Sequence, residues 1–147
     1  MKIIHTADLH LDSAMKTNLS KEKAKMRKNE ILHTFERMVD FAKENEVSVI
    51  LIAGDLFDTK TVTVKTKDII KRCIEENPGI DFLYLKGNHD IEVTLYDEEV
   101  PSNFKLFSEN WTSYDRYSEG MERPSIIPLG CGHVSGNFND FKLSDNE

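Results

Sequence analysis

The sequence predicts an α/β domain with a mainly parallel βαβαβ core. Two observations predict this class: three short apolar runs that favour strands, and two segments of helical periodicity that separate them. Because strand–helix–strand units with short connections form right-handed crossovers, we expect a parallel sheet sandwiched between helices. A chain of 147 residues suits one domain, residues 1–147, with room for a buried core.

The first strand is expected at residues 2–6, directly before Asp8 and His10. An amphipathic helix follows from Ser20, a residue suited to N-capping, to Glu46. Its apolar positions recur at intervals of four, three and four residues: Ile31, Phe35, Met38 and Ala42. The second strand, residues 47–53, is almost entirely apolar and β-branched, which is the pattern of a strand buried on both faces.

The second helix is expected at about residues 62–76, where Asn77-Pro78-Gly79 stops it, and the third strand at residues 82–85. Beyond residue 91 the periodicity weakens, and we expect an acidic, less regular segment of the same domain, residues 91–147. Within it the pattern favours a short helix at 104–110, a strand at 125–129 and a loop at 130–139.

The composition excludes a membrane span and argues against export. The longest apolar run, residues 47–54, is far shorter than the roughly 20 residues that a span needs. Acidic and imidazole groups also appear before any signal-peptide core could form. Because Cys73 and Cys131 are too few for a disulfide scaffold, we expect two reduced thiols in a cytoplasmic protein.

The net charge of −7 is unevenly distributed. Residues 1–90 carry 15 basic and 15 acidic side chains, whereas residues 91–147 carry 4 and 11. If bound metal neutralised some carboxylates, the remaining surface of the first part would be net positive, with basic runs from Lys16 to Lys28 and from Lys60 to Arg72. A solvated helix face is the simpler explanation of either run.

Each of the three strands is followed at once by side chains of metal-binding type. The clusters are Asp8-Leu9-His10, Gly54-Asp55-Leu56-Phe57-Asp58 and Gly87-Asn88-His89-Asp90. Ligands of open parallel sheets bind beyond the carboxyl ends of the strands, so the three clusters should converge. In an extended chain Asp8 and His10 would point to the same side, with Leu9 pointing inward. Gly54 and Gly87 would permit sharp turns and close approach of other groups.

The mixture of carboxylate, imidazole and amide oxygen suits a divalent ion such as Mn, Fe, Zn or Mg, and the lack of cysteine argues against a structural zinc. Two ions about 3.5–4 Å apart would share one carboxylate, and Asp55, on the middle segment, is our choice for that bridge. Asp8 and His10 would then bind one ion, and Asn88 the other.

We assign His89 a different, catalytic role, because histidine can hold a proton near neutral pH and could protonate or stabilise a leaving oxygen. Asp58 and Asp90 are better suited to accepting hydrogen bonds that fix the loops or orient a histidine. A single Asp-X-His is commonly a turn with a solvated histidine. Three clusters at three strand ends favour a site.

These clusters resemble the first three motifs of the calcineurin-like metallophosphoesterases, over roughly residues 1–90. Within that superfamily, residues 5–12 and 52–58 are most similar to the SbcD-type DNA-repair exonuclease branch. The resemblance implies a four-layer α/β/β/α fold, a dinuclear, manganese-type centre and hydrolysis of phosphodiesters by metal-activated water. By position the family's ligands match Asp8, His10, Asp55 and Asn88, its bridging carboxylate matches Asp55, and its histidine beside the scissile phosphate matches His89.

The resemblance also implies DNA as the substrate and a coiled-coil ATPase subunit as the partner, and a homodimer is compatible with it. The family carries further metal-binding histidines downstream, including a Gly-His-X-His element, whereas His133 is the only histidine here after residue 90. Cys131-Gly132-His133 does not match that element, so we interpret His133 as a loop residue. We therefore expect an N-terminal part of a longer protein, with weak metal binding and little or no turnover alone.

Two other functions stay open on the sequence. One is a phosphomonoesterase or phosphoprotein phosphatase of the same superfamily, which would use the same ligands on a different substrate. The other is a catalytically silent interaction module, because downstream ligands are missing and the acidic residues 91–147 could dock a partner.

Overall fold

The computed structural model describes residues 1–15, 18–58, 62–89, 92–97 and 99–107, together with the backbone of 112–116 and 125–129. The elements are β1 (Ile3–Thr6), α1 (Lys21–Glu44), β2 (Val49–Ala53), α2 (Val64–Glu75), β3 (Asp81–Leu85), β4 (Phe104–Leu106), β5 (Thr112–Arg116) and β6 (Ser125–Leu129). The three strands and two helices expected before residue 91 are all confirmed, each within two residues of its expected bounds.

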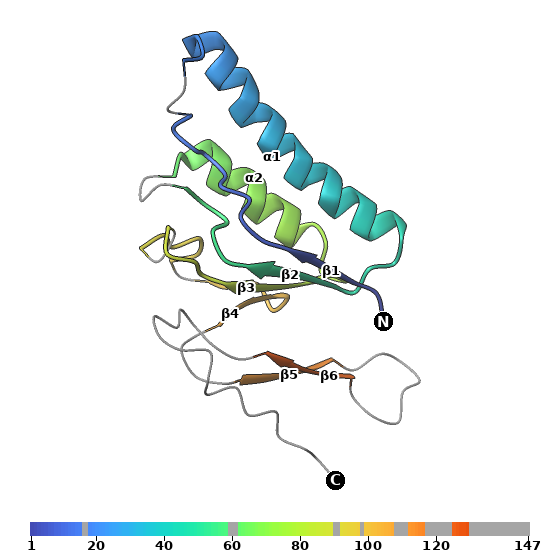
Figure 1. The fold of residues 1–147 in the computed structure, drawn as a ribbon. Helices are drawn as coiled ribbons and strands as arrows, with labels where there is room; N and C mark the ends of the chain where they lie inside the picture. The colour runs from blue at the N-terminus through green and yellow to red at the C-terminus, as the bar shows by residue number, and fades with distance from the viewer. Residues whose placement is uncertain are drawn as a thin grey trace, which may run out of the picture.

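The first four strands form one parallel sheet in the order β1-β2-β3-β4 (Figure 1). In the middle of this sheet Ile50 of β2 is in register with Ile4 of β1 on one side and with Phe82 of β3 on the other. Strands β5 and β6 form a separate antiparallel pair. Since parallel strands all end at the same edge, the loops after β1, β2 and β3 leave the sheet side by side.

Both helices pack on one face of the four-stranded sheet, so the expected sandwich between helices is wrong (Figure 1). The reason is topological: successive right-handed crossovers that add strands in one direction place every helix on the same side. Ile50 and Phe82 face the helices in the main core. Val49 and Leu83 are buried on the opposite face in a second cluster, and Figure 1 shows the β5–β6 pair on that side.

Helix α1 forms because its sequence combines an N-cap with an apolar stripe. The Ser20 hydroxyl accepts a hydrogen bond from Lys23 N over 3.3 Å. The buried side chains of α1 recur every three or four residues, at Leu32, Phe35, Val39 and Ala42. This stripe packs against the sheet and holds α1 across it.

The carboxyl end of α2 is held by a buried amide from the segment before β4. Asn103 is 4% exposed, and its Nδ2 donates to three backbone carbonyls, those of Ile74 at 2.9 Å and of Asn77 and Ile80 at 3.1 Å. The carbonyls of Ile74 and Asn77 also accept from Asn77 N and Ile80 N, so this side chain adds a second donor there and ties the segment before β4 to the end of α2.

The helix expected at 104–110 is wrong where the structure describes it, because residues 104–106 form β4. Phe104 packs its ring against Tyr84 and Tyr96, with centroid distances of 6.2 and 5.3 Å. Phe107 N donates to Tyr84 O over 2.8 Å, which extends the pairing with β3. The strand expected at 125–129 is confirmed as β6, β5 was not foreseen, and the loop expected at 130–139 lies outside the described residues.

Cys73 is buried and free, and burial raises the pKa of its thiol to about 11. This agrees with the expected reduced thiol at that position, while Cys131 lies outside the described residues. Neither described helix is long and apolar enough to cross a membrane.

Candidate metal centre

Backbone hydrogen bonds join the loops that follow β1, β2 and β3 into one platform. Asp8 N donates to Gly54 O over 3.2 Å, and His10 N donates to Asp55 O over 2.9 Å. Gly54 N in turn donates to Leu85 O over 2.9 Å. The three clusters therefore meet at one edge of the sheet, as the positions of the strand ends predict.

The backbone at this platform is left-handed at three of the candidate ligands. The φ angles are 53° at Asp8, 46° at His10 and 49° at Asp55. Asp8 and His10 do lie close together, as expected, but the extended backbone from which we expected this is wrong. The chain coils here so that both N–H groups reach the neighbouring loop. Sparsely populated backbone of this kind is concentrated at functional sites.

Two glycines make the close packing possible, each in a different way. Gly54 has a φ of +90°, a conformation that side chains with a Cβ rarely adopt. Gly87 instead provides space: a Cβ there would lie 2.6 Å from Cγ and 2.5 Å from N of Asp55. The carboxylate of Asp55 thus occupies the room that the missing side chain of Gly87 leaves.

Asp8, His10 and Asp55 form a group whose ligand atoms all lie within 4.8 Å of one another. Nε2 of His10 is 3.9 Å from Oδ1 of Asp8, too far for a direct hydrogen bond. Two carboxylates and an imidazole nitrogen are ligands that divalent ions such as Mn, Fe and Zn accept. The donor set therefore fits a metal ion.

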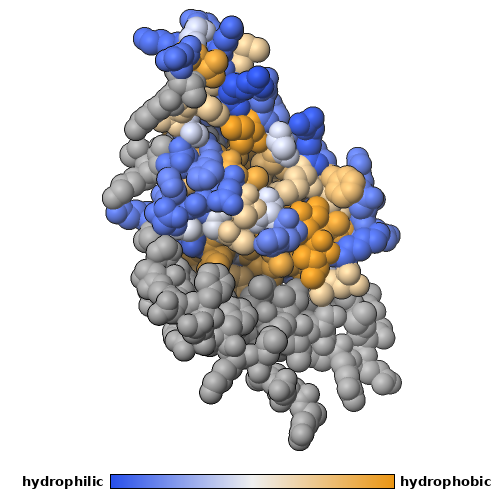
Figure 2. Space-filling model, viewed as in Figure 1, coloured by the Kyte–Doolittle hydropathy of each residue, from blue (hydrophilic) through white to orange (hydrophobic). Residues whose placement is uncertain are grey.

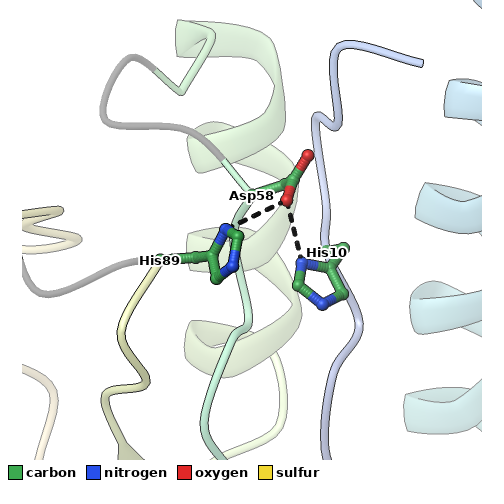
Figure 3. Close-up of side chains that lie close together, drawn as sticks. All are labelled: His10, Asp58 and His89. Carbon is green, nitrogen blue, oxygen red and sulfur yellow. Dashed lines mark hydrogen bonds and ion pairs between the residues drawn. The ribbon is translucent and has the colours of Figure 1, made fainter. Parts of the chain in front are cut away.

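A second group brings together His10, Asp58 and His89 from the three different loops (Figure 3). Oδ1 of Asp58 lies 3.1 Å from Nδ1 of His10 and 3.3 Å from Nδ1 of His89. A hydrogen bond from Ser13 is the main cause that lowers the pKa of Asp58, and the charges of the two histidines lower it further. An ionised carboxylate only accepts hydrogen bonds, so each imidazole donates through Nδ1.

This contact determines which nitrogen of His10 is available to a metal. With Nδ1 donating to Asp58, Nε2 carries the lone pair and lies toward Asp8. A carboxylate that receives the other ring N–H is the usual companion of a metal-binding histidine. Asp58 therefore stands where an orienting carboxylate is needed, and its closeness to both rings explains the second group without a separate ion.

His89 is attached to the same platform through its backbone. Its N–H donates to Oδ1 of Asp55 over 3.0 Å, while its ring meets the ring of His10 edge-on, with 5.2 Å between centroids. The His89 side chain is 44% exposed, so it remains accessible to a molecule that approaches the platform. Asn88, between Gly87 and His89, is also exposed. Asp90 and His133 lie outside the described residues.

Two residues of the platform were given no role by the sequence reasoning. Ser13 is the main cause of the lowered pKa of Asp58. The Asp12 carboxylate accepts a hydrogen bond from Thr63 N over 2.6 Å and lies 3.6 Å from Nζ of Lys28. Both follow His10 closely, and a run of polar residues after a strand end was the available signal. A lone serine or aspartate in a loop has no periodicity, however, so nothing distinguished them from solvated residues.

A family model described as calcineurin-like phosphoesterase matches residues 1–145. The chain belongs to this family. The resemblance of the three clusters is thereby confirmed at the family level. A site where carboxylates and imidazoles could hold a metal ion agrees with membership of these metallophosphoesterases.

The relatives within the family include proteins of DNA repair. The DNA double-strand break repair protein Mre11 of Aeropyrum pernix is 32% identical over 141 residues, which cover 91% of this chain and 32% of that protein. The uncharacterized metallophosphoesterase YhaO of Bacillus subtilis is 33% identical over 113 residues, which cover 74% and 28%. The chain thus spans about a third or less of the length of these relatives.

Among solved structures, the nuclease MPE of Pseudomonas putida matches with a TM-score of 0.49 and 17% identity, over 75% of this chain and 49% of that one.

Proposed function

We propose that this protein hydrolyses phosphodiester bonds with divalent metal ions and that DNA is its substrate. The observation that carries the proposal is the group of Asp8, His10 and Asp55, which brings metal-ligand atoms from two loops within 4.8 Å in a chain of the phosphoesterase family. The name of the Aeropyrum pernix relative, a DNA double-strand break repair protein, favours DNA over a phosphoprotein.

Asp8 and His10 would hold one ion, Asn88 the other, and Asp55 both. Asp55 suits a shared ligand because it lies between the two neighbouring loops: its carbonyl accepts from His10 N, and its carboxylate accepts from His89 N. We favour Mn²⁺ as the ion. When bound, such ions polarise the phosphoryl group and lower the pKa of a water molecule to about 7.

His89 would donate a proton to the departing oxygen. Its ring is accessible, and Asp58 holds its Nδ1, so Nε2 is the atom free to transfer the proton. Asp58 and Asp90 would not contact the substrate but would hold other residues in position. Asp58 fixes the rings of both His10 and His89, and Asp90, directly after His89, would steady that loop.

The role of His89 is tested by manganese-dependent hydrolysis of bis(p-nitrophenyl) phosphate in the full-length protein. We expect His89→Ala to lower kcat by about 10²–10⁴-fold while leaving Mn²⁺ affinity nearly unchanged. His33→Ala is the matched control, because His33 is exposed on α1, where it pairs with its helix neighbour Glu36 at 2.7 Å. Equal kcat values for the two variants would refute the role.

The substrate is tested by comparing single-stranded and duplex DNA with p-nitrophenyl phosphate under the same conditions. Faster turnover of DNA supports the proposal, whereas faster turnover of the monoester identifies a phosphomonoesterase. No turnover of any substrate, together with no saturable Mn²⁺ binding, identifies a silent interaction module.

A further inference from the structure

Helix α1 is much longer than the layer that it covers. Its 24 residues make it about 36 Å long, and Figure 1 shows its N-terminal end projecting past α2. A groove runs between the two helices. The first residue of α1 that lines it is Asn29, and the first residue of α2 that lines it is Lys65. Residues 21–28 precede this groove, and we call them the projecting end.

In the projecting end, lysines occupy the helix face that holds buried apolar side chains in the rest of α1. Counting back from buried Leu32 with the same spacing of four, three and four residues gives Lys28, Lys25 and Lys21. On a helix these positions lie on one face. The face that buries Leu32 and Phe35 against the sheet therefore continues as a lysine face beyond the edge of the sheet.

A fixed contact holds this lysine face beside the metal centre. Nζ of Lys28 lies 3.6 Å from Oδ1 of Asp12 and donates to the Asp12 carbonyl over 3.4 Å. The Asp12 side chain is only 9% exposed, and its Oδ2 accepts from Thr63 N. Asp12 follows His10 by two residues. The projecting end is thus tied to the loop that carries two of the candidate ligands.

Stability does not explain the remaining two lysines. Arg27 pairs with Glu30 at 2.7 Å, whereas Lys21 and Lys25 form no ion pair with any described residue. Positive charge in the first turn of a helix, where Lys21 lies, opposes the helix dipole and slightly destabilises the helix. Figure 2 shows mostly hydrophilic residues, with a few hydrophobic ones between them, at this end of the molecule, at the top of the view. These two exposed cations, which form no ion pair within the described part of the chain, are therefore available to an anionic ligand.

We propose that Lys21 and Lys25 bind the phosphate backbone of DNA as it approaches the metal centre, with Lys28 anchoring the helix that presents them. The inference rests on the proposed function and adds the element that would hold the substrate. Duplex DNA carries one negative charge per roughly 1.7 Å of its axis, so two lysines about 6 Å apart along the helix could each meet a phosphate. Such contacts position the strand without reading its sequence.

The test measures binding of a fluorescein-labelled duplex to the full-length protein by anisotropy, in chelator so that no cleavage occurs, at several salt concentrations. We expect Lys21→Ala with Lys25→Ala to weaken binding severalfold and to reduce the slope of log K against log salt by about two. Lys23→Ala with Lys43→Ala is the matched control. It removes the same charge from the opposite face and from the far end of α1, and we expect it to keep the slope.

A charge-reversal variant distinguishes loss of DNA binding from loss of folding. In Lys21→Glu with Lys25→Glu, the glutamate at position 21 favours the helix dipole and both positions are exposed, so we expect this variant to keep the unfolding midpoint in urea and to weaken binding more than the alanine pair. An unchanged salt slope in both lysine-face variants would overturn this inference alone. Absence of manganese-dependent phosphodiester hydrolysis by the wild-type protein would instead overturn the proposed function, whatever the DNA affinity.

Discussion

The Cα of Gly87 packs against the carboxylate of Asp55, so closely that a Cβ at position 87 would lie 2.6 Å from Asp55 Cγ. No real Cβ contact is that short, and one of the two loops would have to move. The loop after β3 thereby holds in place the residue that we expect both ions to share. The position of the Asp55 carboxylate in the candidate centre therefore depends on residue 87 being a glycine.

Gly87→Ala should therefore damage the centre more than the fold. We expect a loss of stability of about 1–3 kcal/mol from the forced overlap and a loss of Mn²⁺ binding, because the carboxylate of Asp55 would be displaced. Gly79→Ala is the control, since a Cβ there meets nothing within 4 Å. Urea unfolding and calorimetry measure the two effects, and Mn²⁺ binding retained by Gly87→Ala would contradict this interpretation.

Asp58 makes the metal-free protein sensitive to acid. Because the pKa of Asp58 is lowered, first by the hydrogen bond from Ser13 and then by His10 and His89, this carboxylate stabilises the fold fully above its unfolded value of about 3.9. That contribution is lost as the pH falls through the lower pKa of the folded state. We expect Ser13→Ala to raise the pKa of Asp58, which carboxyl titration by NMR can follow in chelator. An unchanged pKa in Ser13→Ala would show that the histidines alone set it.

Asn103 should matter for stability although it lies far from the chemistry. Asn103→Ala removes the buried donor to the carbonyls of Ile74, at the end of α2, and of Asn77 and Ile80, in the turn that follows. We expect a cost of about 1–3 kcal/mol in the free energy of unfolding. Thr34→Ala removes an exposed hydroxyl that bonds Glu30 O and should change stability by no more than about 0.5 kcal/mol. Equal costs for the two variants would contradict the assigned role of Asn103.

The sequence predicted the core of the fold because its strands and helices have strong, distinct patterns. Residues 47–53 are almost continuously apolar, and α1 repeats its apolar positions regularly. The sequence did not reveal β4, because a strand of three residues has little alternation to identify it, and Phe104 and Phe107 are three residues apart, a spacing that also fits a helix. β5 is a largely polar strand, so its apolar pattern is too weak to identify it.

The convergence of the three clusters could be predicted because each follows a strand and parallel strands end together. The left-handed backbone of Asp8 and His10 could not, because it depends on hydrogen bonds to a loop more than 40 residues away. The sharing of one Asp58 oxygen by two histidines also depends on that tertiary arrangement. Sequence patterns identify which residues gather, and the structure adds which atoms face one another.

The most direct test of the metal centre is calorimetric titration of the full-length protein with Mn²⁺, comparing wild type with Asp55→Ala and with Asp68→Ala, an exposed residue of α2 outside the site. We predict saturable binding by the wild type and by Asp68→Ala, and none by Asp55→Ala. Binding that survives Asp55→Ala unchanged, or that the wild type lacks, would contradict the account.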